Sequence, residues 1–142
     1  MSTFAIPNES LDSWINELKT YQKSTIRTFL ENGSPEEAAE KWLTTIGNPN
    51  IASFGGSQID PKPFWNKFKS ECKKFICDEN SYVEEKKGLI NQSGLTKTII
   101  ISTISGHIGS VLGTTGTLVA PAVTLMLFVV GSMSINAYCA LD

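Results

Sequence analysis

Residues 98–140 read TIIISTISGHIGSVLGTTGTLVAPAVTLMLFVVGSMSINAYCA and contain no Asp, Glu, Lys or Arg. All twelve basic residues of the 142-residue chain lie between Lys19 and Lys97, and thirteen of the fourteen acidic residues lie between Glu9 and Glu85. The average composition, with 41% apolar and 18% charged residues, is typical of a soluble globular protein and hides this division. We therefore expect the uncharged region to be enclosed by an apolar environment, either protein or lipid.

Two apolar helices are expected in this region, over about residues 95–112 and 118–140. The linker between them, Gly113-Thr114-Thr115-Gly116, is so short that the helices should pack as antiparallel neighbours. Pro121 is expected in the first turn of the second helix, where its missing N–H breaks no hydrogen bond. The pattern therefore predicts a C-terminal apolar helical hairpin over residues 95–142.

Small residues recur at intervals of four in the first of these helices. Ser102, Gly106 and Ser110 form one row, and Gly109 and Gly113 form another. Small residues at this spacing let two helix backbones approach closely, in a soluble protein as well as in a bilayer. The two rows therefore predict tight helix packing but do not distinguish the two environments.

Three further residues of the hairpin are candidates for packing or for an interface. Leu127 and Phe128 lie in residues 125–130, a run that is apolar on all sides. His107, the only histidine, lies mid-helix in an apolar segment. Its nitrogens are expected to find backbone or hydroxyl partners within the packed hairpin, and the alternative is a buried switch that responds to pH.

Residues 1–94 carry the charge and are expected to form four amphipathic helices. Apolar spacing and capping residues place these helices at about residues 10–32, 34–46, 60–76 and 81–91. The clearest start signal is Ser34-Pro35-Glu36-Glu37, which combines a capping box with a proline in the first turn. Residues 47–60 are expected to form an irregular loop.

Together these patterns predict an all-α fold, in which a small bundle of four amphipathic helices packs with the apolar hairpin as one unit. Trp14, Trp42 and Trp65 lie on the apolar faces of the first three helices. Tryptophan contributes a large apolar area, so these residues are expected to anchor either the core or an interface with a partner.

The sequence shows no motif for catalysis, a cofactor or a metal ion. It has a single histidine, no phosphate-binding glycine motif and no clustered metal ligands, so we expect a protein that is not an enzyme. An enzyme would require His107 to meet a cysteine or Tyr138 in space. A net charge of −2 and a single arginine argue against the binding of nucleic acid.

The three cysteines, Cys72, Cys77 and Cys139, are few and irregularly spaced. The chain opens with the polar residues MSTFAIPNES, which do not form a signal-peptide pattern. Disulfides are rare in reducing compartments, so we expect three reduced thiols in a cytoplasmic protein.

Two functions of different classes are compatible with these patterns. The first is a non-catalytic interaction or accessory protein of the cytoplasm, which self-associates or joins a larger complex through a protein partner. The second is a membrane-inserting protein, a pore-forming effector or an anchor, whose residues 95–140 span the inner (plasma) membrane. Lys86, Lys87 and Lys97 precede the hairpin as basic residues do on the cytoplasmic side of a span, whereas no aromatic belt brackets the second helix.

Overall fold

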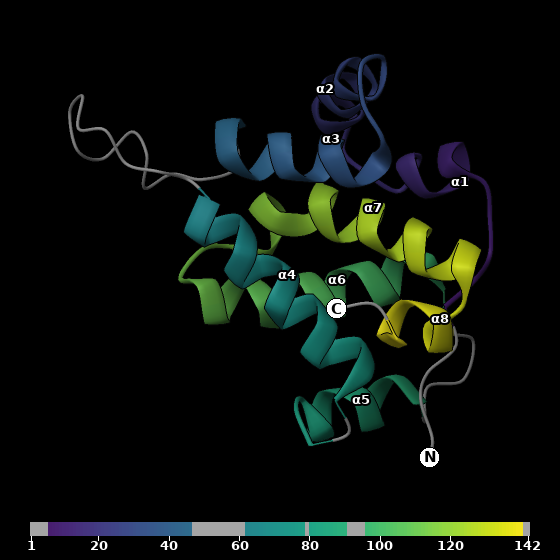
Figure 1. Ribbon diagram of the computed structural model, residues 1–142, viewed down its shortest axis with the longest axis vertical. Coiled ribbons are helices and arrows are strands. Elements are labelled where there is room, and N and C mark those ends of the chain that lie inside the picture. Colours follow the sequence, from purple (N-terminus) through teal and green to yellow (C-terminus); the bar gives the residue numbers. More distant parts are fainter. Residues whose placement is uncertain (1–5, 47–61, 79, 91–95, 141–142) are drawn as a thin grey trace.

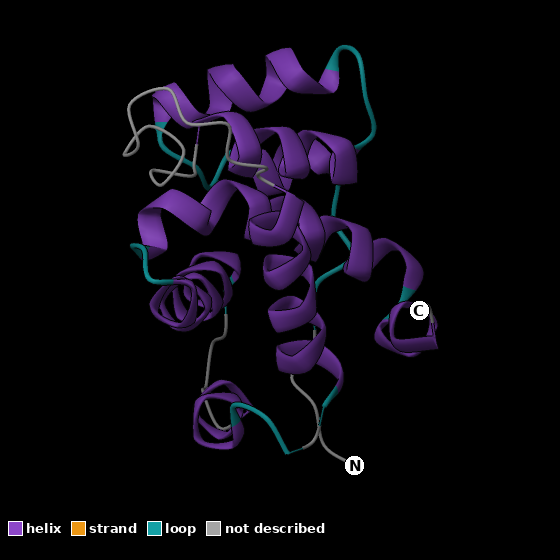
Figure 2. Ribbon diagram, turned by 60° about the vertical axis from the view of Figure 1, so that its left-hand side comes forward, coloured by secondary structure: helices purple, strands orange, loops and turns teal. Residues whose placement is uncertain are grey.

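The computed structural model describes residues 6–46, 62–78, 80–90 and 96–140, which Figure 1 draws as a coloured ribbon. These residues form eight α-helices and one π-helical turn, and they contain no strand (Figure 2). The all-α prediction is therefore confirmed. The elements, in chain order, are α1 (Leu11–Ile15), α2 (Thr20–Leu30), α3 (Pro35–Lys41), η1 (Trp42–Ile46), α4 (Lys62–Cys77), α5 (Val83–Ile90), α6 (Lys97–Leu112), α7 (Gly116–Met133) and α8 (Ile135–Ala140).

Helix α7 lies at the centre of the molecule. Its most extensive contact is with α6, and it also packs against α1, α3, η1 and α8. Figure 1 shows α7 running between α3 on one side and α6 on the other, with α4 crossing in front. Nine of its residues are buried, namely Val119, residues 121–127 and Val130. The middle of this apolar helix is thus enclosed by its neighbours.

Two side chains from the front of the chain bond to carbonyl groups in the first turn of α7. The sequence predicted Pro121 in the first turn of this helix. That prediction is wrong, because the helix begins five residues before Pro121 and the proline lies inside it. Because proline has no N–H, the carbonyl of Thr117 lacks its usual helical donor. Gln22 Nε2 donates to this carbonyl at 3.0 Å, and Trp42 Nε1 donates to the carbonyl of Leu118 at 2.7 Å. The bond from Gln22 replaces the donor that the proline lacks, and both bonds join the two parts of the chain.

All three tryptophans are buried in the core. Trp14, Trp42 and Trp65 are at most 2% exposed, and they belong to one apolar cluster that continues into α6 and α7. Trp65 stacks on Phe68, with 5.6 Å between the ring centroids. Of the two expected roles, the structure therefore places these residues as anchors of the core.

The last charged residue before the uncharged region joins α6 to the N-terminal part of the chain. The side chain of Lys97 is only 14% exposed, and its Nζ lies 2.6 Å from Glu9 Oε1 and 3.9 Å from Glu17 Oε2. The same ammonium group donates a hydrogen bond to Ser13 Oγ. Glu9 and Glu17, which flank α1, therefore bind the ammonium group of Lys97 and attach the start of α6 to the N-terminal part of the chain.

Two of the expected helices are each divided in the structure. The expected helix at residues 10–32 breaks before α2, where Lys19 is extended, and the expected helix at residues 118–140 breaks at Ser134, which has a φ of 92°. At each break a side chain caps the helix that follows: Gln22 Oε1 accepts from Lys19 N at 3.2 Å, and Ser134 Oγ accepts from Ala137 N at 3.2 Å. Such local bonds compete with helix continuation. The described front thus has five α-helices instead of four, and the uncharged region has three instead of two.

The start of α3 matches its prediction in detail. Ser34 Oγ accepts a hydrogen bond from Glu37 N at 3.2 Å, and Glu37 Oε1 accepts one from Ser34 N at 2.8 Å. This reciprocal pair is the capping box expected from the sequence. The loop expected at residues 47–60 and the helix start expected at residues 60–61 lie outside the described residues.

Candidate functional site

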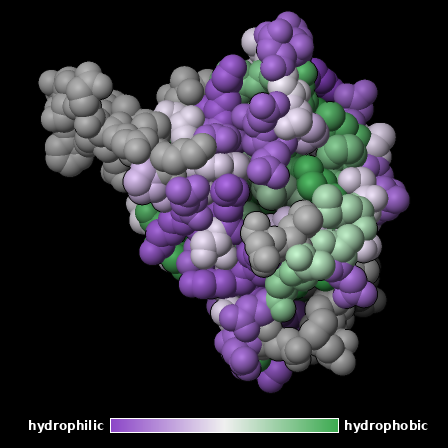
Figure 3. Space-filling model, viewed as in Figure 1, coloured by the Kyte–Doolittle hydropathy of each residue, from purple (hydrophilic) through white to green (hydrophobic). Residues whose placement is uncertain are grey.

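The candidate functional site is the exposed side of residues 98–140. Fourteen of these residues are exposed, and none of them is Asp, Glu, Lys or Arg. Among the described residues before position 98, thirty are exposed, and fourteen of those are charged. In Figure 3, hydrophilic colours cover the region of α3 and α4, whereas pale and apolar colours cover the region of α8. The fourteen residues, called the uncharged surface below, are Thr98, Ser102, Gly106, Ser110, Val111, Gly113, Thr115, Thr117, Ser132, Met133, Ser134, Asn136, Ala137 and Ala140.

Burial explains the apolar interior of α7, but it does not explain the uncharged surface. Roughly 25–35% of the surface positions of a well-behaved soluble protein carry a charge. An exposed Lys or Glu has no desolvation cost, so water alone does not exclude charge from these positions. Most of the residues found there are small or bear a hydroxyl group. Such a surface can be covered by a partner or by lipid without burying a charge.

The two rows of small residues on α6 differ in their surroundings. Ser102, Gly106 and Ser110 are exposed, and among the described residues a Cβ atom added to Gly106 would meet no atom within 4 Å apart from the backbone of its own helix. Gly109 is buried, and a Cβ atom there would lie 2.9 Å from the carbonyl carbon and oxygen of Thr115. The close approach predicted for small residues therefore occurs at Gly109 and also at Gly106, whose backbone would lie 3.1 Å from a Cβ atom added to Gly116 of α7. Ser102 and Ser110 stay at the surface.

The turn between α6 and α7 depends on Gly113. This residue ends α6 in the left-handed conformation, with a φ of 80°, and its N–H bonds to the carbonyl groups of Gly109 and Ser110. Glycine adopts this conformation without a steric penalty. The expected tight connection is therefore present at the expected residues.

A groove of about 330 Å³ runs beside the exposed row, between α6, α7 and the connection from α1 to α2. Its walls include Ser105, which is 2% exposed and whose hydroxyl has no hydrogen-bond partner among the described residues. Glu17 lines the groove as well and accepts a hydrogen bond from Thr98 Oγ1. The groove thus offers mainly small and hydroxyl-bearing groups.

His107 lies on the outer side of α6, toward α5. Its side chain is 43% exposed, and Nδ1 is 3.7 Å from Glu85 Oε2, which is too long for a hydrogen bond. The histidine therefore faces a carboxylate across a gap, not the backbone or hydroxyl partner that was expected. Its exposure also removes the basis for a buried switch at this position.

Leu127 is buried at 1% exposure, and Phe128 is partly buried against the core. Both belong to α7, which over its 18 residues has a mean hydropathy of 1.9. By length and composition alone, α7 is the one helix of the described residues that is able to cross a membrane. Half of this helix is buried inside the molecule, and the central helix of a soluble protein satisfies the same criterion.

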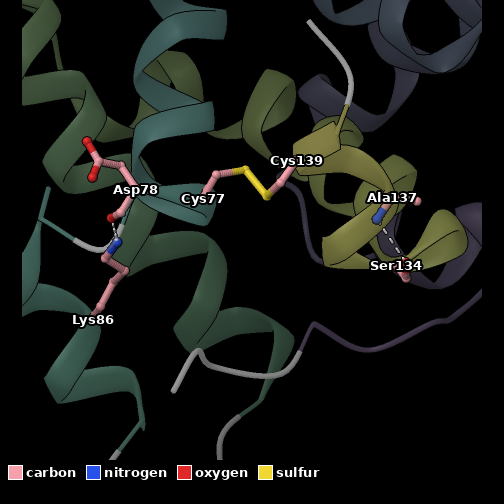
Figure 4. Close-up of a disulfide and its surroundings, with 6 residues drawn as sticks. All are labelled: Cys77, Asp78, Lys86, Ser134, Ala137 and Cys139. Atoms are coloured by element: carbon pink, nitrogen blue, oxygen red, sulfur yellow. Dashed lines mark hydrogen bonds between the residues drawn. A yellow bond between two sulfur atoms is a disulfide. The ribbon is translucent and has the colours of Figure 1, made fainter. Parts of the chain in front are cut away.

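A disulfide joins two of the three cysteines, which corrects the expectation of three reduced thiols. Cys77 at the end of α4 is bonded to Cys139 in α8, with 5.7 Å between their Cα atoms (Figure 4). The two cysteines are 62 positions apart, a spacing with no recognisable pattern, so only the packing of α8 against α4 reveals the pair. Cys72 is free and buried, and burial raises the pKa of its thiol.

A polar cluster joins α4 to the start of α5, away from the uncharged surface. Glu71 accepts hydrogen bonds from Tyr82 Oη at 2.7 Å and from Lys74 Nζ at 3.3 Å. Burial raises the pKa of Glu71, but these two donors outweigh it and leave the pKa below its ordinary value. Burial and the bond to Glu71 raise the pKa of Tyr82. The ionised carboxylate therefore stabilises the contact between the two helices.

Chemistry of other kinds has little support in the described residues. They hold no group of three or more His, Cys, Asp and Glu side chains placed to bind a metal ion. An enzyme that uses His107 with a cysteine would need an accessible thiol, but Cys72 is buried and the other two sulfurs are bonded to each other. Comparison of the chain with family models, with curated proteins and with solved structures finds no match.

Proposed function

We propose that the protein is a non-catalytic helical protein that acts by association, and that two copies meet through the uncharged surface on α6. The observation that carries this proposal is the lack of charge at exposed positions, fourteen of fourteen in residues 98–140. In a twofold dimer the same surface meets itself, so any charge near the axis faces a like charge. An uncharged face avoids this repulsion.

The exposed row on α6 also has the geometry for close contact between helices. Ser102, Gly106 and Ser110 lie on one side of a 16-residue helix, and no atom stands over Gly106 within 4 Å of an added Cβ. Small residues at intervals of four allow two helices to approach until their backbones touch. The groove beside the row, with the unpartnered Ser105 hydroxyl in its wall, leaves room for side chains of the second copy.

Gel filtration with light scattering tests this proposal. The protein is expected to elute as a dimer, and Ser110→Lys is expected to convert it to a monomer because the two added charges face each other. Ser24→Lys is the matched control, since Ser24 is an exposed helical serine on α2 and its replacement should leave the dimer intact. A monomeric wild-type protein, or a dimer that Ser110→Lys leaves unchanged, would contradict the proposal.

A second candidate function is insertion into the plasma membrane, and one specific observation favours it. Residues 116–133 form an 18-residue helix with a mean hydropathy of 1.9, and no charged residue occurs in the whole of residues 98–140. These helices would enter a bilayer without carrying a formal charge, and a helix satisfies its own backbone groups there. In this case the fold is the water-soluble state that precedes insertion.

Flotation with lipid vesicles separates the second candidate from the first. A membrane-inserting protein is expected to float with vesicles of mixed zwitterionic and anionic lipids and to resist extraction with salt. A protein that self-associates without entering lipid stays at the bottom of the gradient, and this result would eliminate insertion. Cell fractionation tests whether the native protein is found in the membrane fraction or in the soluble fraction.

A further inference from the structure

The disulfide joins the ends of two helices that are far apart in the sequence. Cys77 is the last residue of α4, and Cys139 is the residue before the last of α8. Figure 4 shows the bond crossing the space between the two helices. Both cysteines are only partly buried, so the bond lies near the surface and not in the core.

Besides the disulfide, helix α8 is held by a small number of packing contacts with α4 and α7. It has six residues, and helices shorter than about 12–15 residues are marginal in water without tertiary contacts. Tyr138 is its one buried residue. Its covalent link to α7 is Ser134, which leaves the helical conformation and so separates the two helices. The bond to Cys77 is therefore the strongest link between α8 and α4.

A reductant has access to Cys77. A hollow of about 280 Å³ at the end of α4 is lined by this cysteine together with Ser70, Lys73, Lys74 and Asp78. Lys73 in the wall favours the approach of a thiolate, which is the nucleophile in disulfide exchange, whereas Lys74 is paired with Glu71 at 3.3 Å. The carboxylate of Asp78 also lines the hollow and opposes this approach; Asn80 N and Ser81 Oγ donate hydrogen bonds to it, each at 2.9 Å.

We propose that the Cys77–Cys139 bond is a thiol–disulfide exchange site for a dithiol reductant, and that its opening releases α8 from α4. One thiolate of the reductant attacks Cys77 Sγ, the S–S bond breaks, and Cys139 leaves as a thiolate that takes a proton from water. The second thiolate attacks the reductant's own sulfur in this mixed disulfide, and Cys77 leaves as a thiolate that is protonated in turn. The reductant supplies both electrons and ends as a disulfide.

Release of α8 uncovers a third thiol. Cys72 is 2% exposed, and it belongs with Tyr138 of α8 to the apolar cluster that forms where α8 packs against α4. Tyr138 also lines a hollow together with Met126 of α7, so its departure exposes part of the central helix. The proposal goes beyond self-association and does not depend on it.

Counting reactive thiols by mass spectrometry tests this proposal on the full-length protein. Iodoacetamide in native buffer is expected to modify no cysteine before reduction. After dithiothreitol it is expected to modify all three, because α8 leaves and Cys72 becomes accessible. Two modified cysteines after reduction would show that α8 stays in place, and modification of Cys77 and Cys139 without reduction would show that the bond is not formed. Either result would overturn the proposal.

Two variants and one spectrum separate local release from unfolding. Cys72→Ala is expected to show two modified cysteines after reduction, which assigns the third to position 72. Cys139→Ser lacks the bond, so Cys72 and Cys77 are both expected to react without any reductant; protection of Cys72 in this variant would count against release. Far-ultraviolet circular dichroism should change little on reduction, and loss of most of the helical signal would replace local release with global unfolding and overturn the proposal.

Discussion

The described residues before position 98 and residues 98–140 are both helical, but their exposed sides differ in charge. In the first region nearly half of the exposed residues are charged, and apolar residues point inward, as in an ordinary amphipathic helix. In the second region the exposed residues carry no charge either, so the buried and exposed residues differ only in the size and apolarity of their side chains. A lack of charge therefore does not by itself mean that a residue is buried.

Within one chain, only part of the uncharged region is enclosed. The middle of α7 is enclosed, as Leu127 shows, but the row at Ser102, Gly106 and Ser110 is exposed on the single chain. The same lack of charge thus has two causes within one stretch of sequence. In the interior the cause is the cost of burying an ion, and at the surface the proposed cause is contact with a second molecule.

The largest expected effect distinguishes these two causes with the same substitution at two positions. Leu127→Lys places an unpaired charge in the core and is expected to lower the free energy of unfolding by about 4 kcal/mol or more. Ser110→Lys adds a charge to the exposed row and is expected to change it by no more than about 0.5 kcal/mol. Urea denaturation followed by circular dichroism, at a concentration where both proteins are monomeric, measures the difference. Equal losses would mean that the row on α6 is buried.

A second pair of variants compares the two rows of small residues. Gly109→Ala is expected to lower the free energy of unfolding by about 1–3 kcal/mol, because its Cβ would lie 2.9 Å from backbone atoms of Thr115 that have no room to move. Gly106→Ala is expected to raise it by about 0.5–1 kcal/mol, since its Cβ meets nothing and alanine favours the helix. Thermal and urea unfolding both report the sign. Two changes of the same sign would contradict the different surroundings of the two rows.

The smallest expected effect concerns pH, which acts on the front of the chain because residues 98–140 contain no carboxylate side chain. The pKa of Glu71 is lowered in the fold, so its contribution is complete above the ordinary glutamate pKa and is lost as the pH falls through the folded value. The protein is expected to lose free energy of unfolding as the pH falls from neutral to acidic. In the Glu71→Gln variant this loss is expected to be smaller by about 1 kcal/mol. Urea unfolding at several pH values measures this loss. Glu37→Gln, at an exposed capping box, is the control and should reduce it less.

Local patterns in the sequence were sufficient for the helices and several of their ends. The capping box at Ser34 and the left-handed turn at Gly113 involve residues within four positions of each other, so neighbouring side chains and backbone decide them. The breaks at Lys19 and Ser134 were missed, because a single polar side chain there outweighs an otherwise continuous apolar pattern.

Contacts between residues far apart in the sequence could not be predicted from local patterns. The bonds from Gln22 and Trp42 to the first turn of α7 join groups 95 and 76 positions apart, and the disulfide joins residues 62 positions apart. None of these partners has a distinctive spacing, since their meeting depends on how α2, η1 and α4 pack around the central helix. For the candidate site, the sequence identified the small residues, but it did not show which of their faces stay exposed.

The sequence alone determined that the chain is helical, that charge ends at Lys97, and that a tight turn follows at Gly113, because each of these depends on composition or on near neighbours. Only the tertiary structure decided which uncharged residues meet water, which tryptophan and glutamine bond to α7, and which cysteines pair. The physical reason is that burial and pairing are properties of contacts between distant segments, and an uncharged residue is compatible with either side of a helix.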